Sequence, residues 1–129
     1  MNIKNKIIVK TLQRNEIPNY LGCSDLMCCF IKPLYSKIAS SPTKFAESLA
    51  MGVPVVSTKN IGDIEEHTQL LKAGAVLDLN NPDEIDHIIN NIEKIISLGG
   101  NSLRKRASEI LSLDIAINNY KKIYISIVN

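Results

Sequence analysis

The stretch SSPTKFAESLAMGVPVVST, residues 40–58, contains a complete unit of loop, helix and strand. Pro42 favours the first position of a helix, and Gly52 and Pro54 are typical of a helix end. The run VPVVST that follows is apolar on both faces of a strand, which is typical of a strand inside a parallel sheet. This unit predicts an α/β fold.

The same alternation of strand and helix continues on both sides of this unit. We expect further strands at IIVKTL (7–12), LMCCF (26–30) and AVLDL (75–79). LMCCF, VPVVST and AVLDL are expected to be buried on both faces. Short helices are expected within residues 14–25 and 61–74. This order predicts a Rossmann-like parallel sheet, closed by helices in the C-terminal part of the chain.

The C-terminal part carries helix signals only. Residues 81–100 predict one strong helix, with Asn81 as its N-cap and Pro82 at its first position. Its apolar stripe consists of Ile85, Ile88, Ile89, Ile92 and Ile96. Residues 101–112 and 114–128 predict two more helices.

Composition places the chain among ordinary globular proteins. Its 129 residues suggest one domain, and a net charge of +2 does not suggest a nucleic-acid partner. There is no signal-peptide pattern and no apolar run of membrane-spanning length, so we expect a cytoplasmic location. Cys23, Cys28 and Cys29 lack metal-site spacing and are expected to be small buried residues in a reducing compartment.

Lys44 is an unusual residue for its place in the expected helix. With Ser41 as N-cap and Pro42 first, Thr43 and Lys44 are the second and third helical residues, where the helix dipole disfavours a cation. Free backbone N–H groups at this end can hold a phosphate, and a bound phosphate would make Lys44 a favourable partner. In a parallel sheet, ligands bind beyond the carboxyl ends of the strands, here the segments 13–15, 31–41, 59–63 and 80–81.

Glu47 shares a helix face with Lys44. Its carboxylate could accept hydrogen bonds from two sugar hydroxyls, so that both residues together would suit a nucleotide or a nucleotide sugar. The alternative is that Lys44 and Glu47 are a solvated ion pair three residues apart, on an ordinary helix start.

Residues 40–58 resemble the donor-site motif of GT-B nucleotide-sugar glycosyltransferases. The similarity is closest to the large retaining family that builds capsular and lipopolysaccharide sugars. Three other stretches resemble that family: IPNYLGCSDLMCCF (17–30), IGDIEEHTQLLKAGAVLDLNNPDEI (61–85) and LDIAINNYKKIY (113–124). The resemblance covers nearly the whole chain.

The resemblance implies roles for particular residues. Glu47 would bind the nucleotide ribose, and residues 12–14 would lie near the base. The residues that would meet the diphosphate and the sugar are Ser40, Ser41, Thr43 and Lys44. Gly62 and Glu65 match a turn with a structural role. Ala39 stands where the family motif has its first glutamate, so contacts to the transferred sugar are not carried over.

The resemblance also implies what the chain lacks. The family has an N-terminal acceptor domain and two further strands at the start of the donor-binding domain, with the cations that neutralise the diphosphate. We therefore expect residues 1–129 to be an incomplete donor-binding domain that is inactive alone, whether as a truncated gene, a split subunit or an excised piece. No catalytic residue, metal or cofactor is assigned. His67 and His87 are expected to be structural or solvent-exposed.

The resemblance favours the donor-binding part of a glycosyltransferase that transfers a sugar from a nucleoside-diphosphate sugar to a hydroxyl acceptor, in cell-surface polysaccharide or glycolipid synthesis. Attachment to the inner membrane face is compatible with this role. The alternatives are a non-catalytic nucleotide-binding or interaction module that acts with a partner chain, and a sugar-nucleotide epimerase. Self-association is expected through IIVKTL and through a stripe in the last helix formed by Ile117, Tyr120, Tyr124 and Val128.

Overall fold

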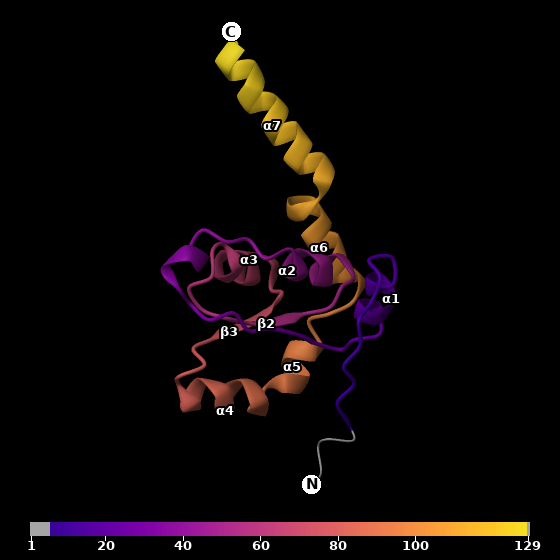
Figure 1. Ribbon diagram of the computed structural model, residues 1–129, viewed down its shortest axis with the longest axis vertical. Coiled ribbons are helices and arrows are strands. Elements are labelled where there is room, and N and C mark those ends of the chain that lie inside the picture. The colour runs from indigo at the N-terminus through magenta and orange to yellow at the C-terminus, as the bar shows by residue number, and fades with distance from the viewer. Residues whose placement is uncertain (1–5, 129) are drawn as a thin grey trace.

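Three short parallel strands form the centre of the protein. In the computed structural model, which describes residues 6–128, helices lie on both faces of this sheet (Figure 1). The elements in chain order are α1 (Ile17–Gly22), β1 (Met27–Cys29), the 3₁₀ turn η2 (Tyr35–Lys37), α2 (Thr43–Ala50), β2 (Val55–Thr58), α3 (Ile64–Leu71), β3 (Gly74–Leu77), α4 (Pro82–Asn90), α5 (Ile92–Ile96), α6 (Asn101–Leu111) and α7 (Leu113–Val128).

The sheet has the strand order β1-β2-β3, and both pairs are parallel. This confirms the predicted α/β fold with a Rossmann-like parallel sheet. β2 is central, and all four of its residues are buried. The expectation that the other strands are buried on both faces is wrong: Cys28 in β1 is exposed, and in β3 only Leu77 is fully buried. β1 is an edge strand, so fewer neighbours cover it.

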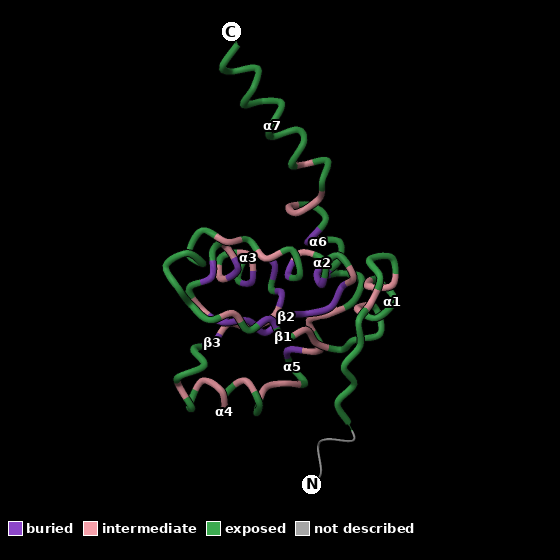
Figure 2. The backbone as a smooth tube through the Cα atoms, viewed as in Figure 1, coloured by how far each residue is buried: buried purple, intermediate pink, exposed green. Residues whose placement is uncertain are grey.

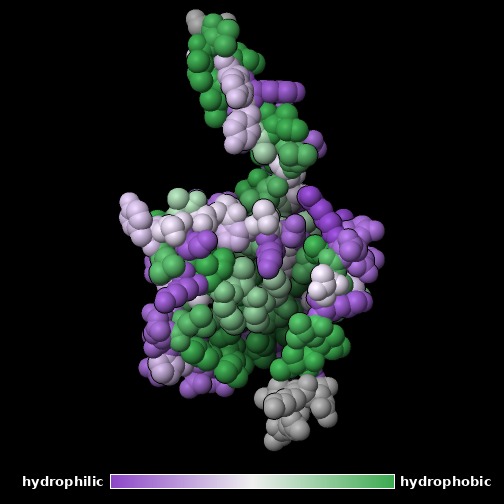
Figure 3. Space-filling model, viewed as in Figure 1, coloured by the Kyte–Doolittle hydropathy of each residue, from purple (hydrophilic) through white to green (hydrophobic). Residues whose placement is uncertain are grey.

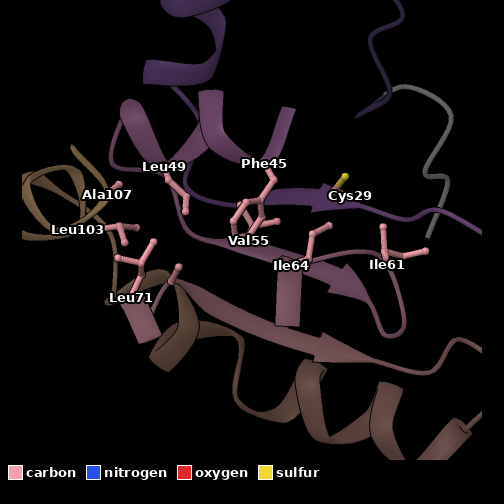
Figure 4. Close-up of a cluster of buried hydrophobic side chains, with 10 residues drawn as sticks. Cys29, Phe45, Leu49, Val55, Ile61, Ile64, Leu71, Leu103 and Ala107 are labelled. Carbon is pink, nitrogen blue, oxygen red and sulfur yellow. The ribbon is translucent and has the colours of Figure 1, made fainter. Parts of the chain in front are cut away.

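The main hydrophobic core lies between the sheet and one layer of helices. α2, α3 and α6 cover this face (Figures 1 and 2). Figure 4 shows side chains from these helices and the sheet meeting there, among them Phe45, Leu49, Val55, Ile64 and Leu103. α4 and α5 cover the opposite face and enclose a smaller cluster of Val56, Leu77 and Ile95.

Residues 7–12 do not form the expected strand. They have no regular secondary structure, and the exposed fractions are 87% for Ile8 and 93% for Val9. The β-branched run has strand propensity, but this propensity stabilises a strand only where a neighbouring strand supplies hydrogen bonds and packing. Lys10 instead contacts Tyr20 of α1, with its ammonium over the aromatic ring.

The expected single helix over residues 81–100 is divided in two at Asn91. The side-chain amide of Asn91 donates a hydrogen bond of 2.8 Å to the carbonyl oxygen of His87, and this competes with regular helix geometry. The expected apolar stripe changes as a result, because Ile89 is exposed while Ile95 is buried. The expected N-cap is confirmed: the side chain of Asn81 accepts a hydrogen bond of 3.1 Å from the backbone N–H of Asp83.

The last two helices behave differently from each other. α6 packs against α2 and α3 and places Leu103 and Ala107 in the core. α7 has no buried residue and projects away from the body (Figures 1 and 2). The C-terminal closure of the sheet is therefore supplied by α4, α5 and α6 and not by α7. None of the described helices combines the length and the hydropathy needed to cross a membrane.

The expectation that all three cysteines are buried is also wrong. Cys29 lies in the core, but Cys23 and Cys28 are exposed. Cys23 follows α1 in a surface turn, and Cys28 lines an apolar hollow on the side of the sheet that faces α4.

Candidate functional site at the carboxyl edge of the sheet

Three polar segments meet where the parallel strands end. They are residues 30–42 after β1, residues 59–63 after β2 and residues 78–81 after β3. Because all three strands run in the same direction, these segments share one edge of the sheet, which is the edge where ligands bind in folds of this class.

Two hydroxyl groups of β2 fix the segment that follows β1. The hydroxyl of Ser57 donates a bond of 2.9 Å to the carbonyl oxygen of Cys29. The hydroxyl of Thr58 accepts from the N–H of Ile31 at 3.0 Å and donates to the carbonyl oxygen of Ile31 at 2.7 Å. These bonds continue the pairing of β1 and β2 past the last regular residue of β1. No local sequence pattern indicates this role of Thr58, because its partner is 27 residues away.

The loop before α2 is held against the loop after β2. The N–H of Gly62 donates a hydrogen bond of 3.1 Å to the carbonyl oxygen of Lys37. Gly62 has a φ of +45°, and a Cβ atom there would lie 1.7 Å from the carbonyl oxygen of Ser40. Only glycine allows this approach, which accords with the structural role expected for Gly62.

α2 begins one residue later than the sequence predicts. Pro42, with φ −68° and ψ 119°, is the N-cap, so Ser41 does not cap the helix. Thr43 and Lys44 are then the first and second helical residues. Their N–H groups have no acceptor within the helix, whereas the N–H of Phe45 donates 3.0 Å to the carbonyl oxygen of Pro42. Lys44 is thus one position closer to the positive end of the helix than expected.

Lys44 and Thr43 line a hollow beside the end of β1. Its volume is about 360 Å³, and its other wall is formed by β1 and the residues that follow it, including Cys29 and Ile31. Burial raises the pKa of the Cys29 thiol, and the nearby positive charge of Lys44 acts in the opposite direction. Lys44 is itself an exposed residue at the wall of this hollow.

Ser40 and Ser41 line a different hollow. It has a volume of about 340 Å³ and lies between the loop before α2 and the start of α3, where it includes Gly62 and Asp63. Glu47 is exposed one turn further along α2 and lines neither of these two hollows. The five candidate residues thus share one continuous loop and helix, but the structure distributes them over adjacent surfaces.

A second cation, which no sequence motif indicates, lies at this edge. Lys59 follows β2 directly, and its ammonium lies 2.8 Å from a carboxylate oxygen of Glu84 in α4. The other carboxylate oxygen of Glu84 accepts 2.9 Å from the N–H of Asp78. The hydrogen bond to Lys59, followed by that from Asp78, lowers the pKa of Glu84, and the bond to Glu84 raises the pKa of Lys59. The ion pair ties the end of β2 to α4.

The two histidines lie apart from this constellation. Nδ1 of His67 is 3.6 Å from a carboxylate oxygen of Asp63, and His87 is an exposed residue of α4. Among the residues that the structure describes, no group of three or more His, Cys, Asp and Glu side chains could hold a metal ion.

A parallel sheet with helices on both faces and polar loops at its carboxyl edge defines the protein as a Rossmann-like α/β protein. Residues 2–97 match the family "Glycosyl transferases group 1", and the chain belongs to this family of glycosyltransferases. The match includes the whole sheet and the segment from Ser40 to Glu47, whereas α6 and α7 lie outside it. Searches of curated proteins and of solved structures found no match.

Proposed function

We propose that this chain is the donor-binding part of a glycosyltransferase and that the start of α2 holds the diphosphate of a nucleoside-diphosphate sugar. The main support for this proposal is the position of Lys44. It occupies the second position of a helix, next to two N–H groups without helical acceptors, and lines the hollow at the end of β1. A cation is unfavourable there unless an anion accompanies it.

The other candidate residues extend the proposed site along both sides of the diphosphate. Glu47, one turn after Lys44 and exposed, would accept hydrogen bonds from the ribose hydroxyls. Ser40 and Ser41, in the adjacent hollow beside Gly62, would face the sugar or the outer phosphate. The loop contact between Gly62 and Ser40 would hold these hydroxyls at a constant distance from the helix start.

In the proposed reaction the sugar moves from the nucleoside diphosphate to a hydroxyl of the acceptor. The bond between the anomeric carbon and the diphosphate oxygen breaks, and a bond to the acceptor oxygen forms. Lys44 and the N–H groups of α2 would stabilise the negative charge that develops on the leaving diphosphate. An acceptor in cell-surface polysaccharide or glycolipid synthesis fits the family resemblance.

Isothermal titration calorimetry with uridine, guanosine and adenosine diphosphates tests the proposal. We expect weak binding of at least one of them. Replacing Glu47 by alanine should weaken this binding by roughly 1–3 kcal/mol, the value of a hydrogen bond to a charged group. Glu93→Ala, on α5 across the sheet, is the matched control and should leave the affinity unchanged. Equal effects of both variants, or no binding of any diphosphate, would contradict the proposal.

The rival function is a nucleotide-binding or interaction module without catalysis, acting with a partner chain. The observation in its favour is the large exposed apolar surface of residues 7–9 and of α7. The two functions differ in their response to sugar. Among nucleotide sugars that share the same nucleoside diphosphate, a transferase donor site should bind one more tightly than those that carry a different sugar. A simple nucleotide module should bind all of them with the same affinity.

A further inference from the structure

We propose that α7 pairs with α7 of a second copy of this chain in an antiparallel arrangement centred on Tyr120. The helix is 16 residues long, projects from the body and contains no buried residue (Figures 1 and 2). A solitary helix of this length is marginal in water even when it is rich in alanine, and α7 is rich in β-branched residues. Its stability therefore requires a partner surface.

The exposed residues of α7 define the surface that would be covered. At helical spacing, one stripe combines large apolar and aromatic side chains: Leu113, Ile117, Tyr120, Tyr124, Ile127 and Val128. Lys122 and Ser126 lie on the other side of the helix. Figure 3 shows hydrophobic residues along this projecting segment. The residues of the stripe, called here the α7 stripe, are exposed by between 39% and 83%.

The spacing of the α7 stripe makes it complementary to itself. Going outward from Tyr120, the stripe has Ile117 and Tyr124 at three and four residues, and Leu113 and Ile127 at seven residues on either side. An antiparallel copy centred on Tyr120 therefore places Ile117 beside Tyr124 and Leu113 beside Ile127. With a two-fold axis through Tyr120, each stripe covers the other, as a closed dimer requires.

The area is sufficient for a specific pair. If the six side chains lose about 100 Å² of accessible surface each on average, less at Ile117 and more at the tyrosines, the two stripes together bury about 1,200 Å², the lower limit for stable interfaces. The body offers an additional contact. A hollow of about 240 Å³ between α2 and α6 is lined by Ala46, Ala50 and Leu111, at the base of α7. The tip of the partner helix would arrive level with this base.

Light scattering on the intact chain at high micromolar concentration tests the pairing. We expect a dimer for the natural sequence and a monomer for Ile117→Asp. Ser126→Asp introduces the same charge on the opposite side of the helix and should leave the dimer intact. Neither residue contributes to the core, so the body should keep its circular dichroism spectrum. The proposal would be overturned if the natural chain were monomeric at this concentration. It would also be overturned if the monomeric chain bound to added vesicles of anionic lipid, because α7 would then bind lipid and not a second copy.

Disulfide trapping tests the antiparallel arrangement. Cys23 and Cys28 are exposed and are first replaced by serine. In this background Tyr120→Cys should form a dimer disulfide, because both copies lie at the two-fold axis. Ile117→Cys should not, because its two copies would be separated by about 9 Å along the helix axes. Cross-linking of both variants would indicate a parallel pair, and cross-linking of neither would refute the contact; either result overturns the proposed arrangement.

Discussion

Gly62 lies so close to Ser40 that a Cβ atom at position 62 would be 1.7 Å from the carbonyl oxygen of Ser40. This contact joins the loop after β2 to the loop before α2. Ser40 and Ser41 belong to the proposed donor site, and Gly62 lines the same hollow from the turn after β2. The geometry of the proposed site therefore depends on the turn after β2 as well as on the loop before α2.

Replacing Gly62 by alanine should disturb both stability and binding. The added methyl group must displace the backbone at Ser40, which should cost roughly 1–3 kcal/mol of unfolding free energy in urea denaturation. Gly22→Ala is the control, because a Cβ there meets only the flexible end of Met51 at 3.1 Å. If Gly62→Ala were as stable as Gly22→Ala, the close contact would be incorrect.

We expect Lys44 to lower the free energy of unfolding slightly while it strengthens the binding of a nucleoside diphosphate. Replacing it by glutamine removes a cation from the second position of α2 and should leave the unfolding free energy unchanged or raise it by about 0.3 kcal/mol. The same change should weaken the binding of a nucleoside diphosphate by roughly tenfold, through the loss of a charge-assisted contact. Lys94→Gln, on α5, should affect neither property. A destabilised Lys44→Gln protein with normal affinity would show that Lys44 has a structural role only.

The ion pair of Lys59 and Glu84 should make stability depend on pH. The pKa of Glu84 is lowered from 4.5 and that of Lys59 is raised from 10.5. The contribution of Glu84 is therefore complete above its ordinary pKa and is lost as the pH falls through the lower folded-state value. That of Lys59 is complete below its ordinary pKa and is lost as the pH rises through the higher folded-state value.

Glu84→Gln should consequently lower the urea midpoint at neutral pH and have little effect at a pH below the folded-state pKa of Glu84. Asp83→Asn makes the same change of charge at the neighbouring position of α4. Asp83 forms no ion pair in the described structure, so its replacement should produce a smaller difference at neutral pH. A pH-independent effect of Glu84→Gln would mean that the pair does not stabilise the fold.

Residues 7–12 should exchange their amide hydrogens rapidly. They form no strand and expose Ile8 and Val9, whereas Val55 and Val56 of β2 are buried in the centre of the sheet. Hydrogen exchange followed by mass spectrometry should show near-intrinsic rates for 7–12 and the strongest protection in β2. Protection of residues 7–12 comparable to that of β2 would show that the segment pairs with an open strand edge, in the same chain or in a second copy.

Local sequence patterns correctly predict two kinds of element: a helix end that is capped by its own residues, and a strand that has neighbours on both sides. Asn81 and Pro82 are sufficient to predict the cap of α4. The apolar run of β2 is buried as predicted, because helices cover both faces of the sheet at this strand. The strand at residues 7–12 was predicted wrongly because its propensity required a neighbour. The break at Asn91 depends on one side-chain hydrogen bond that outcompetes a helical pattern.

The candidate site was predictable as a segment but not as an arrangement. The start of α2 and its lysine are visible in residues 40–47, with an error of one position at the cap. Thr58, the pair of Lys59 and Glu84, and the separation of Ser40 from Lys44 into different hollows arise from contacts between distant parts of the chain. No spacing within the sequence encodes such contacts directly.

A nucleoside diphosphate should bind at the start of α2, and NMR titration can locate its binding site residue by residue. Backbone amide shifts would be followed while uridine, guanosine or adenosine diphosphate is added to the natural chain. We predict that the largest changes occur in residues 40–47 and around Cys29 and Ile31, whose backbone lines the same hollow as Lys44. Saturable changes confined to other regions, such as α4, α5 or α7, would contradict it.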